Sequence, residues 1–286
     1  DEEALRRALH ELVLRHEPLR TTFVEQDGRP FQLIAPVLEP SLDVVELRDV
    51  PDSEREAEAW RRLHEEARRP FDLEKGPLLH AVLYRLSSSE HVLLLTLHHI
   101  VTDGWSMGVM VREVAELYAA FASGLPSPLP ALPLQYAAFA SWQRQWLQGE
   151  ALEAQLSYWR QRLDPSAVLQ LPGDRPRPAT SSARGARHTV FLPAQLAESL
   201  KDLGARDGRT LFSVLLAAFN VLLHRYCGQD DVTVGTPIAG RNRADLEGLI
   251  GLFVNTLAVR TDLSGDPTFQ QLVGRVHETA LGAFAH

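Results

Sequence analysis

Hydrophobic residues recur at helical spacing in several segments of the chain. Near the N-terminus, one face of a predicted helix over residues 2–16 carries Leu5, Leu9, Leu12 and Val13. The same spacing predicts helices over residues 52–69, 105–121, 134–148, 151–163, 194–206 and 210–226, and from Pro267 onward. In the helix at 105–121, we expect Arg112, Glu113 and Glu116 on the polar face.

Short apolar or alternating runs between these helices predict strands. They cover residues 20–26, 30–35, 41–48, 78–86, 90–100, 187–192, 231–238 and 252–262. The first two flank Asp27-Gly28, a dipeptide typical of a tight hairpin turn. The run at 90–100 is almost continuously apolar, so we expect it at the centre of a sheet, covered on both faces. Mixed helices and strands in this order predict an α/β fold.

A segment rich in Pro, Gly and Ser divides the chain. It covers residues 173–185 and contains no large apolar residue, which is typical of a linker. We therefore expect an N-terminal lobe over residues 1–172 and a C-terminal lobe over residues 186–286. A faint repeat of helix, His/Arg pair and strand, at 4–26 and 211–236, favours two lobes of one α/β type with a cleft between them.

Composition and charge argue against several classes of protein. The net charge of −8 gives no electrostatic support for nucleic-acid binding. A single cysteine, Cys227, cannot form an internal disulfide, which fits a cytoplasmic location. No segment reaches the ~18 uninterrupted apolar residues of a membrane span. The acidic N-terminus is no signal peptide, and because both ends interrupt helices, we expect a piece of a longer protein.

The segment from His98 to Gly104 carries the candidate chemistry, because it lies where an apolar strand ends and a helix begins. Successive side chains on a strand point to opposite faces, so His98 and His99 should have different roles, one structural and one facing the cleft. The residues alone do not choose between them. An imidazole can accept a proton near neutral pH, which suits a general base.

Asp103 follows His99 by four residues and has two interpretations. It either orients the imidazole directly or acts as a structural acid, pairing with an arginine and capping the helix. Arg15 and Arg20 are the best candidates for that pairing, since a buried carboxylate needs a cation or several N–H donors. Gly104 permits backbone angles that other residues resist and leaves room for a substrate.

Other kinds of site have less support. His and Asp are metal ligands, but no third ligand stands at a clear spacing, so we predict no metal. The chain has no Gly-x-Ser-x-Gly elbow, no P-loop and no Gly-x-Gly-x-x-Gly motif. The aromatic residues between Tyr136 and Trp159 are typical of helix packing.

Four motifs in order resemble those of condensation domains from nonribosomal peptide synthetases. Residues 98–104 resemble the HHxxxDG motif, and residues 15–23 resemble RHExLRTxF. Residues 136–143 resemble YxDYAxWQ, with Ala138 in place of the usual Asp, and residues 250–256 resemble IGxFVNT. The family's opening motif and its later segments are absent, so the resemblance implies a domain truncated at both ends, with an incomplete second lobe.

The resemblance implies a two-lobed, chloramphenicol-acetyltransferase-like fold with the active site in a tunnel between the lobes. It also implies that a donor aminoacyl or peptidyl thioester and an acceptor aminoacyl thioester enter from opposite sides. Both substrates ride on phosphopantetheine arms of upstream and downstream carrier domains, next to an adenylation domain, and the domain itself binds no cofactor. The acceptor amine attacks the donor carbonyl and forms an amide.

The resemblance assigns roles to individual residues. His99 becomes the catalytic histidine, as proton acceptor or as the group that positions the amine, and Gly104 offers its N–H to the thioester oxygen. His98, Asp103 and Arg15 become structural, with Asp103 paired to Arg15. The expected tunnel-lining residues are Trp105, Ser106 and Asn255. Because Trp105-Ser106-Met107 follows the motif, the chain resembles condensing members and not epimerization relatives. The sequences of the motifs resemble most those of the class that joins two L-residues.

Two alternatives stay open. A non-catalytic relative would only dock carrier domains or recruit another enzyme, and we expect it to lack the motif's His or Gly. A related acyltransferase with a soluble acceptor would keep the catalytic histidine but lack flanking adenylation and carrier domains.

Overall fold

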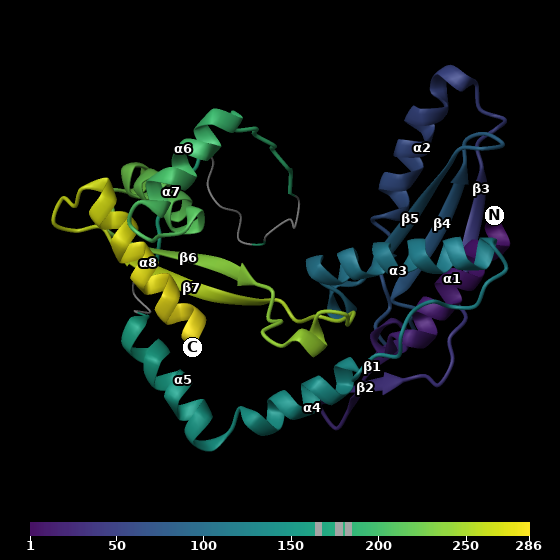
Figure 1. The fold of residues 1–286 in the computed structure, drawn as a ribbon, viewed down its shortest axis with the longest axis horizontal. Helices are drawn as coiled ribbons and strands as arrows, with labels where there is room; N and C mark the ends of the chain where they lie inside the picture. Colours follow the sequence, from purple (N-terminus) through teal and green to yellow (C-terminus); the bar gives the residue numbers. More distant parts are fainter. Residues whose placement is uncertain (164–167, 175–179, 181–184) are drawn as a thin grey trace. The chain divides into compact units, whose positions relative to one another are not determined.

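A computed structural model describes residues 1–163, 168–174, 180 and 185–286 (Figure 1). The chain forms two compact units. The first contains residues 1–146 and 239–254, and the second contains residues 147–238 and 255–286. We call residues 239–254 the connecting segment, because in the chain they join two strands of the second unit although they pack in the first.

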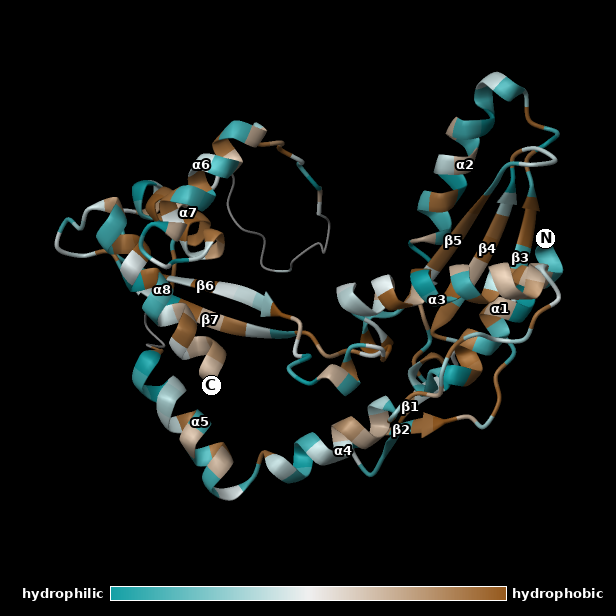
Figure 2. Cartoon of the chain, viewed as in Figure 1, coloured by the Kyte–Doolittle hydropathy of each residue, from teal (hydrophilic) through white to brown (hydrophobic). Residues whose placement is uncertain are grey.

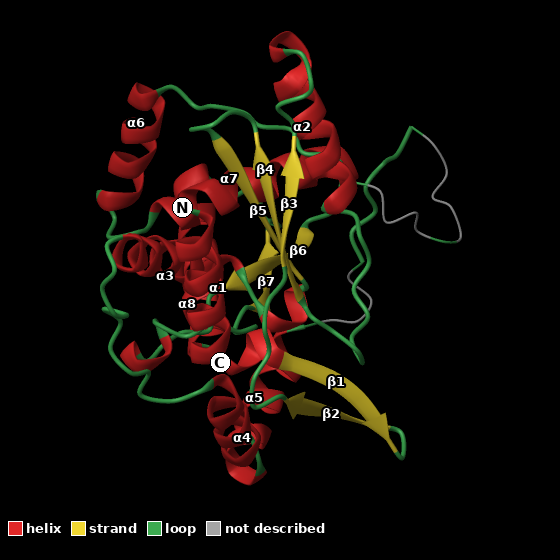
Figure 3. Cartoon of the chain, turned by 90° about the vertical axis from the view of Figure 1, so that its right-hand side faces the viewer, coloured by secondary structure: helices red, strands yellow, loops and turns green. Residues whose placement is uncertain are grey.

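The first unit is built on a three-stranded sheet in the order β3-β4-β5. Its strands are β3 (Leu42–Glu46), β4 (Leu79–Arg85) and β5 (His91–Leu97). Strand β3 runs parallel to β4, and β5 runs antiparallel to it with Leu97 opposite Leu79. Helices α1 (Glu2–Arg15) and α3 (Gly104–Ala122) pack against one face, and α2 (Asp52–Glu66) packs against the other (Figures 1 and 3).

Alternation along the strands supplies both faces with apolar side chains. Leu79, Ala81 and Leu83 of β4 enter the core with α1 and α3, whereas Val82 and Tyr84 enter the core with α2. Figure 2 shows the same distribution, with hydrophobic strands and a largely hydrophilic α2. The unit also contains η1 (Glu17–Arg20), the hairpin β1 (Thr21–Gln26) and β2 (Arg29–Ile34), η2 (His99–Val101), and α4 (Tyr136–Trp146).

The second unit pairs two antiparallel strands with helices. Its elements are α5 (Gly149–Arg162), α6 (Ala194–Ala205), α7 (Leu211–Cys227), β6 (Asp231–Ile238), β7 (Asn255–Asp262) and α8 (Phe269–Ala285). Helix α7 begins at the side-chain cap of Thr210 and ends at Gly228, which adopts a left-handed conformation. The inward residues Val232 and Val259 of the strands pack with Val214 of α7 and Val276 of α8.

The connecting segment packs tightly in the first unit. It includes η3 (Ala244–Leu246), and its Leu246, Leu249 and Phe253 form a core with Phe139 of α4. Two glycines allow this packing. A Cβ on Gly251 would overlap the Tyr136 ring, and one on Gly240, whose φ is +65°, would overlap the carbonyl oxygen of Phe253.

The predicted helices form, but two of the predicted strands differ from the structure. Strand β5 is not central: among the described residues it pairs only with β4, so its edge position leaves its apolar side chains half-buried. Its sequence is typical of a buried strand because both of its faces meet a hydrophobic core. Residues 187–192 form no strand and have no strand partner in the described chain, and Phe191 is 88% exposed.

The two units also differ from the predicted lobes. The boundary lies after Trp146, not at residue 172, because α5 belongs to the second unit, where Trp159 packs against the core. The connecting segment belongs to the first unit, which a division at a single linker could not foresee. The predicted linker at 173–185 falls largely outside the described residues. No helix in the described part of the chain is long and apolar enough to span a membrane.

We expect Gly240→Ala to destabilise the chain much more than Gly28→Ala. Both glycines have positive φ, +65° and +72°, so each alanine costs about 1–2 kcal/mol for a left-handed backbone. A Cβ at Gly28 meets nothing within 4 Å, whereas one at Gly240 meets Phe253. The clash adds about 1–3 kcal/mol, measurable as a lower urea midpoint. Equal midpoints would show that the close approach at Gly240 is absent.

Candidate functional site

The motif from His98 to Gly104 lies in the turn between β5 and α3. Strand β5 ends at Leu97, and His98 caps the short helix η2, with its Nδ1 accepting the backbone N–H of Ile100 at 3.0 Å. That bond places the ring proton of a neutral His98 on Nε2. The ring meets Phe71 edge-on, at 5.8 Å between centroids. His98 is therefore held by its neighbours on both sides.

His99 has the opposite environment. The residue is exposed, and its imidazole makes no side-chain hydrogen bond with any part of the chain that the structure describes. The two histidines do differ, but strand alternation is not the cause, because the strand has already ended and His99 opens a 3-10 turn. The catalytic role of His99 stays a prediction that this exposure allows.

Asp103 is buried and is fully engaged in hydrogen bonds. Its carboxylate caps α3 and accepts five donors from two parts of the chain. They are the N–H and hydroxyl of Ser106 (both 2.8 Å), Nη2 of Arg241 (3.4 Å), and the N–H groups of Phe253 (2.9 Å) and Val254 (3.2 Å). No lone pair is left to orient His99, so the structure favours the structural interpretation of this acid.

Electrostatics at Asp103 favour the ionised carboxylate. Burial by itself raises the pKa of Asp103. The N–H groups of Ser106 and Phe253, the Ser106 hydroxyl and the positive charge of Arg241 together outweigh burial, so the pKa lies below its usual value. The carboxylate is therefore charged at neutral pH, and it ties the start of α3 to the connecting segment.

The predicted pairing of Asp103 with Arg15 is wrong. The cation beside Asp103 is Arg241, whose side chain is fully buried. Arg15 instead donates from Nε to Glu113 at 3.2 Å and from Nη1 to the carbonyl oxygen of Pro130 at 2.6 Å. Glu113 stands ten residues beyond Asp103 on α3, about 15 Å along the helix, so Arg15 cannot serve both acids.

Arg241 connects several backbone groups besides Asp103. Its Nη1 donates to the carbonyl oxygens of Leu246 and Leu249, and its Nη2 donates to the Ser106 hydroxyl at 2.8 Å. Its guanidinium also lies over the Phe253 ring, 4.0 Å from the centroid. Burial lowers the pKa of Arg241, and the charge of Asp103 opposes that effect. Arg241 thus holds the backbone of the connecting segment in place and ties it to the start of α3.

Glu113 corrects the predicted polar face of α3. It is buried, 4% exposed, and accepts Nε2 of His16 at 2.7 Å as well as Arg15. Burial raises the pKa of Glu113, but the bonds and charges of His16 and Arg15 outweigh it and the pKa is lowered. The helix pattern placed Glu113 beside Arg112 and Glu116, which are exposed. Glu113 stands among the apolar residues of α3 that are buried, and this spacing was the available signal that Glu113 is buried too.

The three residues expected to line the tunnel lie in different surroundings. Ser106 is wholly buried, because its hydroxyl binds Asp103, Arg241 and Gly251, so it lines no open surface in this structure. Trp105 is about half exposed and donates from Nε1 to the carbonyl oxygen of Glu247 at 2.9 Å. Asn255 is exposed at the start of β7, in the second unit, and accepts the Thr256 N–H.

Gly104 is the first residue of α3 and is exposed. Its φ is not positive, so the expected need for unusual backbone angles is wrong. A Cβ there would meet nothing within 4 Å, so the glycine leaves open space at the start of the helix. The N–H groups of a first helical turn have no intrahelical acceptor and carry partial positive charge, which suits an oxyanion.

Sequence reasoning missed Arg241 and His16. Arg241 stands 138 positions from Asp103, and its only signal is the run Gly240-Arg241-Asn242-Arg243 after a strand. His16 lies inside a recognised motif, yet its spacing to Ile250 carries no periodicity.

Among the described residues, no group of three or more His, Cys, Asp or Glu could hold a metal ion.

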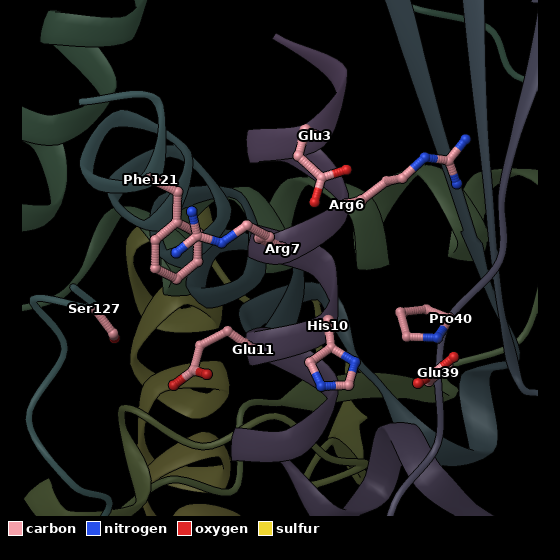
Figure 4. Close-up of a pocket in the computed structure, with 9 residues that line it drawn as sticks. All are labelled: Glu3, Arg6, Arg7, His10, Glu11, Glu39, Pro40, Phe121 and Ser127. Carbon is pink, nitrogen blue, oxygen red and sulfur yellow. The ribbon is translucent and has the colours of Figure 1, made fainter. Parts of the chain in front are cut away.

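The cavity in Figure 4 is separate from this motif. It has a volume of about 600 Å³ and lies along α1, where Arg7 stacks over Phe121 at 4.4 Å. Its lining residues are Glu3, Arg6, Arg7, His10, Glu11, Glu39, Pro40, Phe121 and Ser127. None of the predicted site residues is among them.

We expect Arg241→Ala to destabilise the chain by about 3–5 kcal/mol, because it leaves Asp103 as a buried charge without its cation. Arg48→Ala is the matched control: Arg48 also pairs with an acid, Glu46, but is half exposed, so its loss costs about 0–1 kcal/mol. Urea unfolding of both variants measures the difference. Similar losses for the two arginines would contradict a brace at Asp103.

Comparison with known proteins agrees with the motifs. The family model described as "Condensation domain" matches residues 1–286. A linear gramicidin synthase of Brevibacillus parabrevis is 54% identical over 287 residues, which is all of this chain but only 4% of that protein. Chondramide synthase of Chondromyces crocatus is 50% identical, again over all of this chain and 7% of its own length. The chain thus spans a small part of these relatives.

Solved structures give the same result. The X-domain from teicoplanin biosynthesis is 34% identical with a TM-score of 0.90, and its complex with OxyB gives 33% and 0.87; both cover 100% of this chain and 63% of theirs. The first condensation domain of the calcium-dependent antibiotic synthetase is 27% identical with a TM-score of 0.78, covering 100% and 67%. The chain therefore belongs to the condensation domain family of nonribosomal peptide synthetases, generally acyltransferase-type enzymes, and has its mixed α/β, chloramphenicol-acetyltransferase-like fold.

Proposed function

We propose that this chain catalyses amide formation between two thioester-bound substrates. The donor is an aminoacyl or peptidyl thioester, and the acceptor is the amine of an aminoacyl thioester. The observation that carries the proposal is His99, an exposed imidazole without a hydrogen-bond partner in the described chain, on a turn that buried Asp103 holds in place. An imidazole free of protein partners is available to a substrate amine.

The chemistry needs one proton transfer and one stabilised oxyanion. The acceptor nitrogen attacks the thioester carbonyl carbon, the C–S bond breaks, and the amine proton ends on the departing sulfur. His99 accepts that proton or positions the amine for attack. Gly104 lies in the first turn of α3, where its N–H would face the developing oxyanion. Absence of a side chain there leaves the carbonyl room to approach.

The substrates would arrive on partner domains. Both would be carried on phosphopantetheine arms of an upstream and a downstream carrier domain, with an adenylation domain in the same synthetase. The chain would bind no cofactor of its own and would work in the cytoplasm. We assign it to the class that joins two L-residues, because the sequences of its motifs resemble that class most.

Recruitment of another protein is the second candidate function. The similarity to the teicoplanin X-domain, solved in a complex with OxyB, favours it. Against it stand His99, Asp103 and Gly104, all present here in a braced turn. We therefore place catalysis first.

We expect His99→Ala, made in the full-length parent protein, to lower amide transfer between carrier-bound substrates by at least about 10²-fold, the contribution of a general base. Folding should survive, because His99 is exposed and its side chain bonds to no described residue. His91→Ala is the control, an exposed histidine at the other end of β5. Transfer is measured as product bound to the acceptor carrier, and stability by urea unfolding.

Product formation at the parental rate by His99→Ala would refute the catalytic role. A parent protein that binds carriers but forms no amide would favour recruitment instead.

A further inference from the structure

His16 is a buried histidine between three parts of the first unit. It follows α1 directly, is 1% exposed, and contacts Glu113 of α3 and Ile250 of the connecting segment. Neither the proposed chemistry nor the brace at Asp103 uses it. Each nitrogen of this buried imidazole has a hydrogen-bond partner, as buried polar groups require.

The hydrogen bonds fix which nitrogen carries the proton. The backbone N–H of Ile250 points to Nδ1 at 3.3 Å, so Nδ1 must be the acceptor. Nε2 then carries the hydrogen and donates it to the Glu113 carboxylate at 2.7 Å. His16 therefore joins α3 to the connecting segment only as the neutral Nε2–H tautomer.

Ile250 begins the stretch that binds the motif. Its neighbour Gly251 donates its N–H to the Ser106 hydroxyl, and the N–H groups of Phe253 and Val254 bind Asp103. The stretch 250–254 is thus held at its first residue by His16 and at its last two by Asp103. Loss of the first contact loosens the stretch that fixes the start of α3.

We propose that His16 is a positioning residue for the motif, and that its protonation at Nδ1 releases Ile250 and the stretch that braces the catalytic turn. A second proton at Nδ1 would set an N–H against the N–H of Ile250. The effect on transfer rests on the proposed function, whereas the effect on the stretch 250–254 does not.

Burial favours the neutral form of His16 in the folded chain. Burial is the largest effect and lowers the pKa of His16; Glu113 on α3 raises it, and Arg15 on α1 and Arg241 on the connecting segment lower it further. In the unfolded chain a histidine titrates near 6.5. The pKa of His16 is lower in the folded chain than in the unfolded chain. The hydrogen bond from Ile250 to Nδ1 is therefore fully present above pH 6.5 and is lost as the pH falls through the folded pKa.

Two isosteric substitutions separate the two hydrogen bonds. The amide oxygen of the residue in His16→Asn can replace Nδ1 and accept from Ile250, whereas the amide nitrogen in His16→Gln can replace Nε2 and donate to Glu113. Amide hydrogen exchange of residues 250–254 in the full-length protein reports the stretch directly. At pH 7.5 we expect His16→Asn to keep protection and His16→Gln to exchange about tenfold faster.

The pH profile tests protonation. Lowering the pH stepwise from 7.5 until the folded protein begins to unfold, with intrinsic exchange rates corrected, should speed exchange in the parent protein and leave His16→Asn unchanged. Amide transfer should follow the same pattern, with kcat lowered and KM kept for His16→Gln. His10→Asn, in α1 and without a hydrogen bond to Ile250, is the control and should behave as the parent.

Equal exchange in His16→Asn and His16→Gln would overturn the inference, whatever their transfer activity. Altered exchange with parental transfer would overturn the positioning role. If the parent itself transfers nothing, the proposed function fails, while the exchange pattern still decides whether His16 holds Ile250.

Discussion

The buried carboxylate of Asp103 is the interaction on which the rest of the site depends. It binds the first turn of α3 through Ser106 and the connecting segment through Phe253 and Val254. Four of its five donors are hydrogen-bond donors without net charge, and the fifth is Arg241, so the charge is neutralised and solvated by the protein itself. A carboxylate satisfied in this way holds two distant chain segments in one geometry.

This arrangement separates stability from chemistry within one short motif. The residues that fix the structure, Asp103 and Ser106, are buried, while His99 and Gly104 are exposed and have no described side-chain partners that a substrate would have to displace. Rigidity around a free imidazole preorganises it without occupying its lone pair. Asp103 therefore contributes through the stability of the turn and His99 through the proposed proton transfer. Substitution of Asp103 should change the free energy of unfolding, and substitution of His99 should change the rate of amide transfer.

Local pattern predicted most of the fold, because helices and the β1-β2 hairpin depend on spacing that the sequence displays. It failed where a long-range contact decides. The helical spacing places Glu113 on the polar face of α3, but a hydrogen bond from the distant His16 accompanies its burial. The sequence of β5 is typical of a central strand because both of its faces are apolar, although the strand lies at the edge of the sheet. The motif resemblance predicted a structural role for Asp103 but the wrong cation, Arg15, which belongs to another of the recognised motifs. Arg241 reaches Asp103 only because the connecting segment folds back into the first unit, and no sequence pattern shows that path.

The two ends of the stretch 250–254 differ in how they respond to acid. Hydrogen bonds and Arg241 lower the pKa of Asp103, so its grip on Phe253 and Val254 persists well below neutral pH. His16 holds Ile250 only while neutral, and Glu113 beside it, also with a lowered pKa, stays charged and attracts the added proton. Mild acid therefore weakens the stretch from the Ile250 end while the Asp103 end still holds. With the hydrogen bond to Ile250 lost and those to Phe253 and Val254 kept, the turn becomes more mobile while the rest of the unit stays folded.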